Sequence, residues 1–273
     1  MSEIAVKKRV ITAVCVVLIV IIGLFFLPVF VYAAIVMFLI GIGLYEFYTL
    51  IEKKGIFLYK SLGIFIGLLI PLSVYSRLGL SAEWELFFAA ICVLIFFILY
   101  LTRKDNSQAI IGISTSLFGI FYVSCFFSFL IKIRLLPQGV FLAAFLLLIT
   151  KIGDIGAYII GTNLGRNSFF SKISPKKTLE GAFGGLLFSL IAALLSKLYL
   201  GHIPLIHLFF MGLLIAIVAQ LGDLCESLIK RDCAVKDSGK YFPGLGGVLD
   251  IIDSIIFTAP IFYYYLSYFD LIL

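Results

Sequence analysis

Apolar runs about 20 residues long recur along this chain, and only short polar breaks separate them. A run of that length, wound as a helix, crosses the roughly 30 Å hydrocarbon core of a bilayer. Of the 273 residues, 63% are hydrophobic and 13% are charged, against roughly 25% charged in a soluble domain. Lipid has to cover the apolar surface that such a chain cannot bury in one core. The sequence therefore predicts an all-α, polytopic integral membrane protein.

Nine apolar stretches qualify as transmembrane helices. They lie near residues 10–27, 29–50, 56–76, 85–102, 109–131, 138–160, 180–199, 205–228 and 247–268. Only Leu27 and Pro28 separate the first two stretches, which form either a tight hairpin or one broken helix. Three basic residues precede the first stretch as in a signal peptide, but no small-residue cleavage pattern follows. We therefore expect a retained first span.

Basic residues predict the orientation of these helices. With the N-terminus inside, the inner segments hold sixteen Lys and Arg residues and the outer segments hold four, as the positive-inside rule requires. The inner residues are Lys7, Lys8, Arg9, Lys53, Lys54, Lys60, Arg103, Lys104, Arg166, Lys172, Lys176, Lys177, Lys230, Arg231, Lys236 and Lys240, and the outer ones are Arg77, Lys132, Arg134 and Lys197. Both long polar loops, about 161–179 and 229–246, then face the cytoplasm.

Polar motifs concentrate in the second half of the chain. We therefore divide it into an N-terminal membrane-helix region, 1–135, and a C-terminal catalytic membrane-helix region, 136–273. In the N-terminal region, Glu46 lies inside the second apolar stretch. We interpret this residue as structural, either a local hydrogen-bonding group or a neighbour of lipid headgroups.

Two short motifs precede the longest charged segment. Lys151 and Asp154 are three residues apart, so they share a helix face and can neutralise each other. Alone, they also fit a structural ion pair. Ser174 can cap a helix that starts at Pro175, and the lysines and threonine that follow suit a phosphate at that helix end. The alternative is an ordinary basic loop with a good cap.

The densest charges lie at the facing ends of the last two stretches. Four polar residues share one face at the end of the eighth apolar stretch: Asp223, Glu226, Ser227 and Lys230. Two aspartates, Asp250 and Asp253, lie at the start of the ninth stretch. Two helix ends would then present carboxylates at the same depth in the membrane. Such carboxylates suit Mg²⁺, which usually binds through one or two carboxylates together with a substrate phosphate. The alternative is helix capping and ion pairing with the nearby basic residues. Without a His or Cys nucleophile–base pair, these charges favour phosphoryl or nucleotidyl transfer to a lipid.

The stretch from Ser227 to Asp253 resembles the signature of the phosphatidate cytidylyltransferases, also called CDP-diacylglycerol synthases. The matching residues, at matching spacing, are Ser227, Lys230, Arg231, Lys236, Asp237, Gly239, Pro243, Gly246, Gly247, Asp250 and Asp253. Segments 153–158 and 174–181 resemble the same family. Leu245 and Ile251 replace the family's usual histidine and arginine. Because the metal-type carboxylates remain, we expect these two changes to tune substrate contact without abolishing catalysis.

The resemblance implies a reaction of CTP with phosphatidate that gives CDP-diacylglycerol and pyrophosphate, with Mg²⁺ as cofactor or Mn²⁺ in its place. The implied metal ligands are Asp223, Asp250 and Asp253. The implied catalytic residues are these three with Lys230, Arg231, Lys236 and Asp237. The implied substrate-binding residues are Asp154, Ser174, Lys176, Lys177, Thr178, Glu180, Ser227, Gly246 and Gly247.

The expected location is a bacterial inner or plasma membrane, with the site facing the cytoplasm and with the bilayer, CTP and phosphatidate as partners. No nucleic-acid partner is expected. The sequence leaves open whether the chain forms a homodimer and whether a monovalent cation such as K⁺ shares the site.

Two other functions compete with this interpretation. A CTP-dependent polyprenol or phytol kinase has a similar membrane setting, but it should lack the long pattern from Ser227 to Asp253. A membrane transporter would use Lys151, Asp154 and Asp223 as a polar pathway. That function predicts charges near the bilayer midplane and repeated halves, whereas the charges here crowd the helix ends and the halves do not resemble each other.

Overall fold

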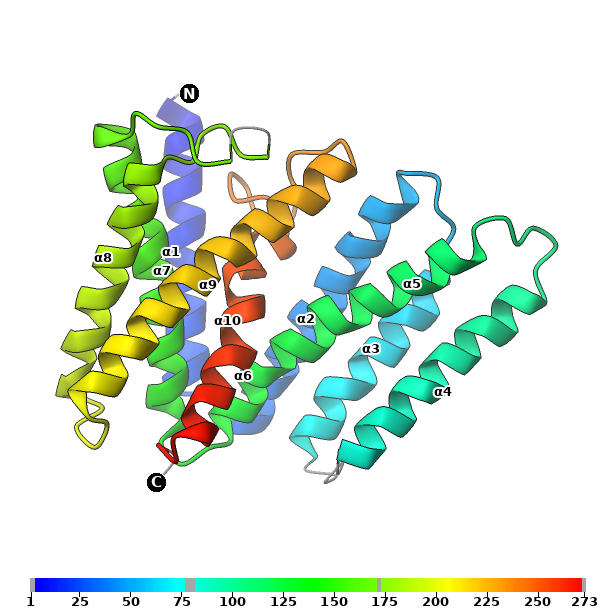
Figure 1. Ribbon diagram of the computed structural model, residues 1–273, viewed down its shortest axis with the longest axis horizontal. Coiled ribbons are helices and arrows are strands. Elements are labelled where there is room, and N and C mark those ends of the chain that lie inside the picture. The colour runs from blue at the N-terminus through cyan, green and yellow to red at the C-terminus, as the bar shows by residue number, and fades with distance from the viewer. Residues whose placement is uncertain (1–2, 77–81, 171–172, 272–273) are drawn as a thin grey trace.

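The computed structural model describes residues 3–76, 82–170 and 173–271. Within these ranges the chain forms ten α-helices and no β-strand (Figure 1). Two residues used for the orientation, Arg77 and Lys172, lie outside the described residues, as do the side chains of Lys7, Lys8 and Arg9. The helices are α1 (Glu3–Phe25), α2 (Val29–Glu52), α3 (Lys60–Tyr75), α4 (Ala82–Leu101), α5 (Ala109–Gly119), α6 (Phe126–Arg134), α7 (Gly139–Leu164), α8 (Leu179–Leu195), α9 (Leu205–Asp232) and α10 (Leu249–Tyr268).

The predicted all-α membrane architecture is confirmed. Six helical segments are long and apolar enough to cross a membrane: Val29–Glu52, Ala109–Arg134, Gly139–Leu164, Leu179–Leu198, Leu205–Asp232 and Leu249–Tyr268. Three shorter apolar helices, Val14–Phe25, Lys60–Tyr75 and Phe87–Leu101, coincide with the remaining predicted stretches. The count of nine spans stays a prediction. Of the two arrangements left open for the first stretches, the structure has separate helices, α1 and α2, with Pro28 directly before α2.

Two local features shape the bundle. A π-helical turn, Ile120–Cys125, joins α5 to α6 in one long segment. Helices α7 and α8 pack closely through glycines, because a Cβ atom at Gly156 would lie 2.6 Å from the Phe188 side chain and one at Gly184 would lie 2.5 Å from that of Ile160. Small residues at such crossings let membrane helices approach. This close approach positions the loop that follows α7 against the start of α8.

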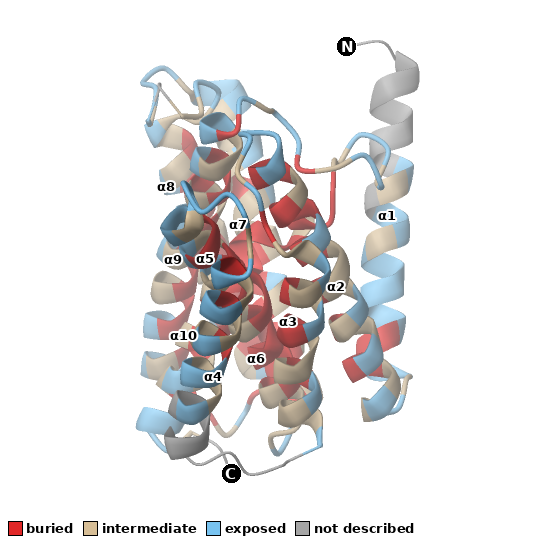
Figure 2. Cartoon of the chain, turned by 90° about the vertical axis from the view of Figure 1, so that its right-hand side faces the viewer, coloured by how far each residue is buried: buried red, intermediate tan, exposed pale blue. Residues whose placement is uncertain are grey.

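The predicted inner loops gather at one end of the bundle. In Figure 1 the α7–α8 loop (165–178) and the α9–α10 loop (233–248) lie at the same end as the α2–α3 and α4–α5 connections. Lys54, after α2, forms an ion pair of 2.6 Å with Asp232 at the end of α9. The buried core lies below this end, among α2, α6, α7, α9 and α10 (Figure 2). Segments that the charge count placed on one side of a membrane therefore do lie together.

A candidate active site at one end of the bundle

Lys230 joins the ends of the last two long helices. The spacing on α9 predicts that Glu226 and Lys230 share a face, and the structure confirms this with an ion pair between them. The Lys230 ammonium also lies 2.6 Å from Oδ1 of Asp250 on α10. Glu226 is fully buried, and among the described residues the Lys230 ammonium is the one group that neutralises its carboxylate directly. Lys230 is therefore the main neutralising charge for both acids.

Asp250 is held by the α9–α10 loop as well as by Lys230. Its Oδ2 accepts hydrogen bonds from the backbone N–H and the hydroxyl of Ser238, both at 2.8 Å, and from the N–H of Gly247 at 2.7 Å. Gly246 has φ of +99°, and a Cβ atom there would lie 2.3 Å from the same Oδ2. Glycine at 246 thus serves both the turn and the close approach of the carboxylate.

Glu46 reaches the same loop from α2. Its carboxylate accepts hydrogen bonds from the backbone N–H groups of Val248 and Leu249 and from the Ser238 hydroxyl. The interpretation of Glu46 as a hydrogen-bonding group is confirmed, but its partners are about 200 residues away rather than local. The sequence signal was a single acid inside an apolar span, where a charge is costly unless it is paired or used.

A second acidic group lies around Lys151. Its ammonium donates to Asp154 at 3.1 Å, as predicted, and also to the Ile251 carbonyl at 3.2 Å and the Ser254 hydroxyl at 3.1 Å. The carboxylate of Asp253 is buried and interacts electrostatically with Asp223, Asp154 and Lys151. Helices α7, α9 and α10 thus bring three carboxylates and one ammonium into one electrostatic neighbourhood.

The α7–α8 loop brings Lys177 to these acids. The Lys177 ammonium lies 2.6 Å from Oδ2 of Asp223. The predicted helix start is wrong: α8 begins at Leu179, and Thr178 rather than Ser174 is its cap, accepting from the N–H of Gly181 at 3.1 Å. The physical reason is that residues before Thr178 pair across the loop, with the Phe169 N–H donating to the Lys177 carbonyl at 2.7 Å.

Some of the other predicted site residues hold the loops in place, and others have exposed side chains around the site. Glu180 accepts from the backbone N–H groups of Arg166 and Asn167, so it fixes the α7–α8 loop. Arg231, in the last turn of α9, donates to the Ile173 carbonyl at 3.2 Å and so connects the end of α9 to the α7–α8 loop. Ser227 and Gly247 are buried, Ser174 and Gly246 are partly buried, and Lys176, Lys236 and Asp237 are exposed.

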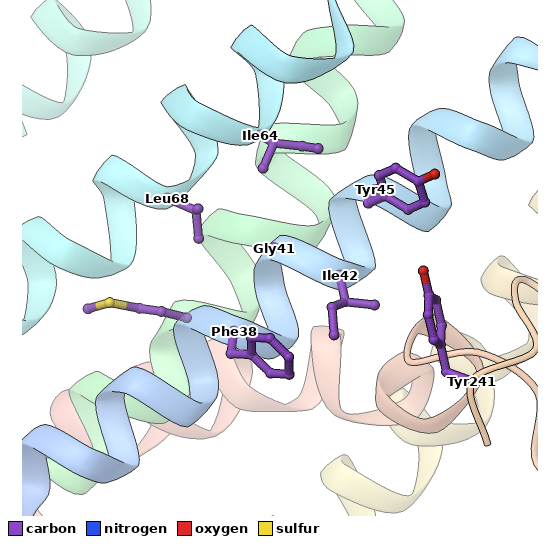
Figure 3. A pocket seen from close by; sticks show the side chains of 8 residues that line it. Phe38, Gly41, Ile42, Tyr45, Ile64, Leu68 and Tyr241 are labelled. Carbon is purple, nitrogen blue, oxygen red and sulfur yellow. The ribbon is translucent and has the colours of Figure 1, made fainter.

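An apolar groove borders the site on the α2 side. It has a volume of about 280 Å³ and lies between α2 and α3, with Tyr241 of the α9–α10 loop at one end (Figure 3). Its lining consists of Met37, Phe38, Gly41, Ile42, Tyr45, Ile64, Leu68 and Tyr241. The loop that holds Asp250 therefore has an apolar surface directly beside it.

The charges fit a divalent cation at some positions better than at others. Within the described ranges, no three His, Cys, Asp or Glu side chains are already grouped to hold a metal. Asp154, Asp223 and Asp253 nevertheless repel one another around Lys151, and a hard divalent cation would offset that repulsion. Asp250 differs, because three hydrogen-bond donors of the α9–α10 loop already surround its Oδ2. Only its Oδ1, which faces the Lys230 ammonium, keeps an acceptor position for a metal. The metal site stays a prediction.

Cys233, directly after α9, has the properties of a packing residue. It is buried, and burial raises the pKa of its thiol above the ordinary value. A thiol with a raised pKa stays protonated near neutral pH and is a poor nucleophile. The chemistry of the site therefore rests on its carboxylates, its cations and the loop backbone.

Comparison with known proteins identifies a family whose members resemble nearly the whole chain. Residues 7–269 match the cytidylyltransferase family. A phosphatidate cytidylyltransferase of Synechocystis is 35% identical over 263 residues, covering 86% of this chain and 87% of the relative. One of Bacillus subtilis is 39% identical over 151 residues, covering 55% and 56%. The uncharacterized Escherichia coli protein YnbB is 47% identical over 130 residues, covering 48% and 44%. With a match from residue 7 to residue 269, the chain belongs to the cytidylyltransferase family.

Proposed function

We propose that this protein is a phosphatidate cytidylyltransferase, which transfers CMP from CTP to phosphatidate. The similarity to the Synechocystis relative, which extends over 86% of the chain, carries the proposal. The site supports it chemically: acids, basic residues and a tight loop meet at one end of a set of apolar helices. Neither a kinase nor a transporter is favoured by these observations.

The proposed reaction depends on neutralising the charge of the phosphates rather than on a general base. The phosphate of phosphatidate is already an anion, and its oxygen attacks the α-phosphorus of CTP. A new P–O bond forms while the bond from the α-phosphorus to the bridging oxygen of the β-phosphate breaks. Pyrophosphate leaves with the electron pair of that bond. Positively charged groups lower the barrier because they neutralise the charge that builds up during transfer.

Residues of this chain fill distinct roles in that scheme. Lys177 and the exposed Lys176 and Lys236 bind the triphosphate and the departing pyrophosphate. Lys230 holds Asp250 in place, because two carboxylates already engage its ammonium. Thr178, at the start of α8, keeps that helix end close to the nucleotide phosphates. The acyl chains stay in lipid while the headgroup enters between helices.

Asp223 and Asp253 are the proposed magnesium ligands, with Asp154 beside them and Asp250 as a further candidate. When bound, Mg²⁺ supplies a Lewis acid that polarises phosphoryl oxygens. Mn²⁺ substitutes for it in this proposal. The questions of a K⁺ ion in the site and of a homodimer stay open, as the sequence left them.

A labelling experiment tests the reaction. The purified protein in detergent is incubated with phosphatidate, Mg²⁺ and one nucleoside triphosphate at a time, labelled at the α- or the γ-phosphate. We expect lipid to acquire label only from α-labelled CTP, with pyrophosphate as the second product. Label from the γ-phosphate would identify a lipid kinase. No labelled lipid with any nucleotide would contradict both enzymatic functions.

We also propose that the site faces the cytoplasm. The support is the clustering of the basic inner loops at one end of the bundle, together with the positive-inside rule. In a variant without Cys15, Cys92, Cys125, Cys225 and Cys233, a cysteine is placed at the exposed Lys240 or the exposed Gly201. Lys240 belongs to the α9–α10 loop and Gly201 to the α8–α9 connection, and these two segments lie at opposite ends of the bundle (Figure 1). We expect an impermeant maleimide to label Gly201→Cys in intact cells and Lys240→Cys only after permeabilisation. The reverse pattern would show the opposite orientation.

A further inference from the structure

Glu46 occupies the place where the N-terminal region meets the α9–α10 loop. Its side chain is buried, with 2% of the residue exposed. Oε1 accepts from the N–H of Val248 at 3.0 Å, and Oε2 accepts from the N–H of Leu249 at 2.8 Å and from the hydroxyl of Ser238 at 2.9 Å. One carboxylate therefore binds both sides of a loop that lies 192 to 203 residues further along the chain.

These hydrogen bonds complete the start of α10. The first N–H groups of an α-helix have no partner within the helix and need an outside acceptor. Val248 is the residue before α10, and its side chain makes no capping hydrogen bond. The Glu46 carboxylate takes over that function from another helix, and its negative charge is favourable at the positive end of the α10 dipole. Asp250 lies in the first turn of this helix.

Two glycines of the loop make room for Glu46. A Cβ atom built at Gly239 or at Gly247 would lie only 2.3 Å from Oε1 of Glu46. Neither glycine has the positive φ that would itself demand glycine. Close approach of the Glu46 carboxylate therefore explains why both positions carry no side chain.

Ser238 links Glu46 to the candidate active site. Its hydroxyl lies 2.9 Å from Oε2 of Glu46 and 2.8 Å from Oδ2 of Asp250. Ionised carboxylates only accept hydrogen bonds, so the two acids share the single proton of this hydroxyl, which lies between them. A shift of Glu46 would move Ser238, and through it the carboxylate that Lys230 engages.

We infer that Glu46 is a positioning residue for catalysis: it fixes the start of α10 and the α9–α10 loop, and thereby the orientation of Asp250. This inference rests on the proposed cytidylyltransferase function. It assigns part of the active-site architecture to a helix outside the segment that resembles the family signature. Residues that orient metal ligands typically change activity or metal affinity by about 10–100-fold when they are altered, and Asp250 is a candidate ligand in the proposed function.

Glu46→Gln tests the inference with little change in side-chain size. Gln turns one acceptor oxygen into an N–H₂ group that would face a backbone donor. We expect kcat to fall by about 10–100-fold and the Mg²⁺ concentration for half-maximal activity to rise, with KM for phosphatidate changed by less than about threefold. Glu52→Gln is the matched control, because Glu52 lies on the same helix and forms a 3.2 Å ion pair with Lys60. A kcat for Glu46→Gln within about twofold of wild type would overturn the inference.

Hydrogen–deuterium exchange gives a readout that does not need the reaction. Backbone amides at 248 and 249 should exchange faster in Glu46→Gln than in Glu52→Gln, while the middle of α9 stays unchanged. Equal exchange in the two variants would refute the contact itself. An inactive wild type with slow exchange at 248 and 249 would refute the proposed function and leave the contact intact. Should Glu46→Gln fail to fold, Ser238→Ala removes only the bridging hydroxyl and should raise the Mg²⁺ requirement in the same direction; an unchanged requirement would count against the inference.

Discussion

Replacing Asp223 by Asn should lower the turnover of CTP by about a thousandfold or more, while the protein still folds and inserts. Asn has nearly the same shape but no charge, so it removes both the counter-charge of Lys177 and a proposed metal ligand. A metal ligand contributes several kcal/mol to the stabilisation of charge in the transition state. Losing that much slows turnover about a thousandfold, because each 1.36 kcal/mol changes the rate about tenfold. The measurement is kcat in detergent with Mg²⁺ varied.

Asp232→Asn provides the control for this variant. Asp232 is at the end of the same helix, α9, and pairs with Lys54 on the exposed surface. We expect this change to leave kcat near the wild-type value. Near-normal turnover of Asp223→Asn, or full wild-type activity in excess EDTA, would rule out a metal site at Asp223.

Replacing Lys230 by Met should cause the largest loss of stability. Lys230 lies between Glu226, which is fully buried, and Asp250, whose side chain is 8% exposed. Removing one member of a buried ion pair leaves uncompensated charge and typically costs about 3–5 kcal/mol. The free energy of unfolding, measured by SDS titration in mixed micelles, should fall by that amount.

Two further variants make the Lys230 result specific. Lys54→Met breaks the ion pair with Asp232, which is well exposed, and should leave the stability unchanged within error. Adding Glu226→Gln to Lys230→Met removes one orphaned charge and should restore part of the loss. If Lys230→Met unfolds at the same SDS fraction as wild type, the ammonium does not hold α9 and α10 together.

Local sequence signals predicted the helices well. The stretches at 205–228 and 247–268 correspond to α9, Leu205–Asp232, and α10, Leu249–Tyr268. Helix length and hydropathy are properties of neighbouring residues, so a single sequence carries them. The shared face of Glu226 and Lys230 followed from helical spacing in the same way.

Contacts between distant segments could not be predicted in this way. The cap of α8 was misplaced because Phe169 and Lys177 pair across their loop, which spacing along the chain does not reveal. The partners of Glu46 lie in the α9–α10 loop, and nothing in the neighbourhood of residue 46 identifies them. The sequence placed the candidate carboxylates on two helix ends, but only the fold distinguishes Asp250, whose Oδ2 has three donors from the α9–α10 loop, from Asp223 and Asp253.

The long separation between Glu46 and its partners has a consequence for biosynthesis. Ribosomes deliver α2 to the membrane early and α10 last, so the Glu46 carboxylate enters the bilayer about 200 residues before its hydrogen-bond donors are made. A carboxylate without partners is unfavourable in hydrocarbon, so we expect α2 to gain stability in the membrane when α10 joins it. A chain truncated before Val248 would leave the Glu46 carboxylate without the backbone donors of Val248 and Leu249, so we expect the loss of α10 to weaken the packing of α2 as well.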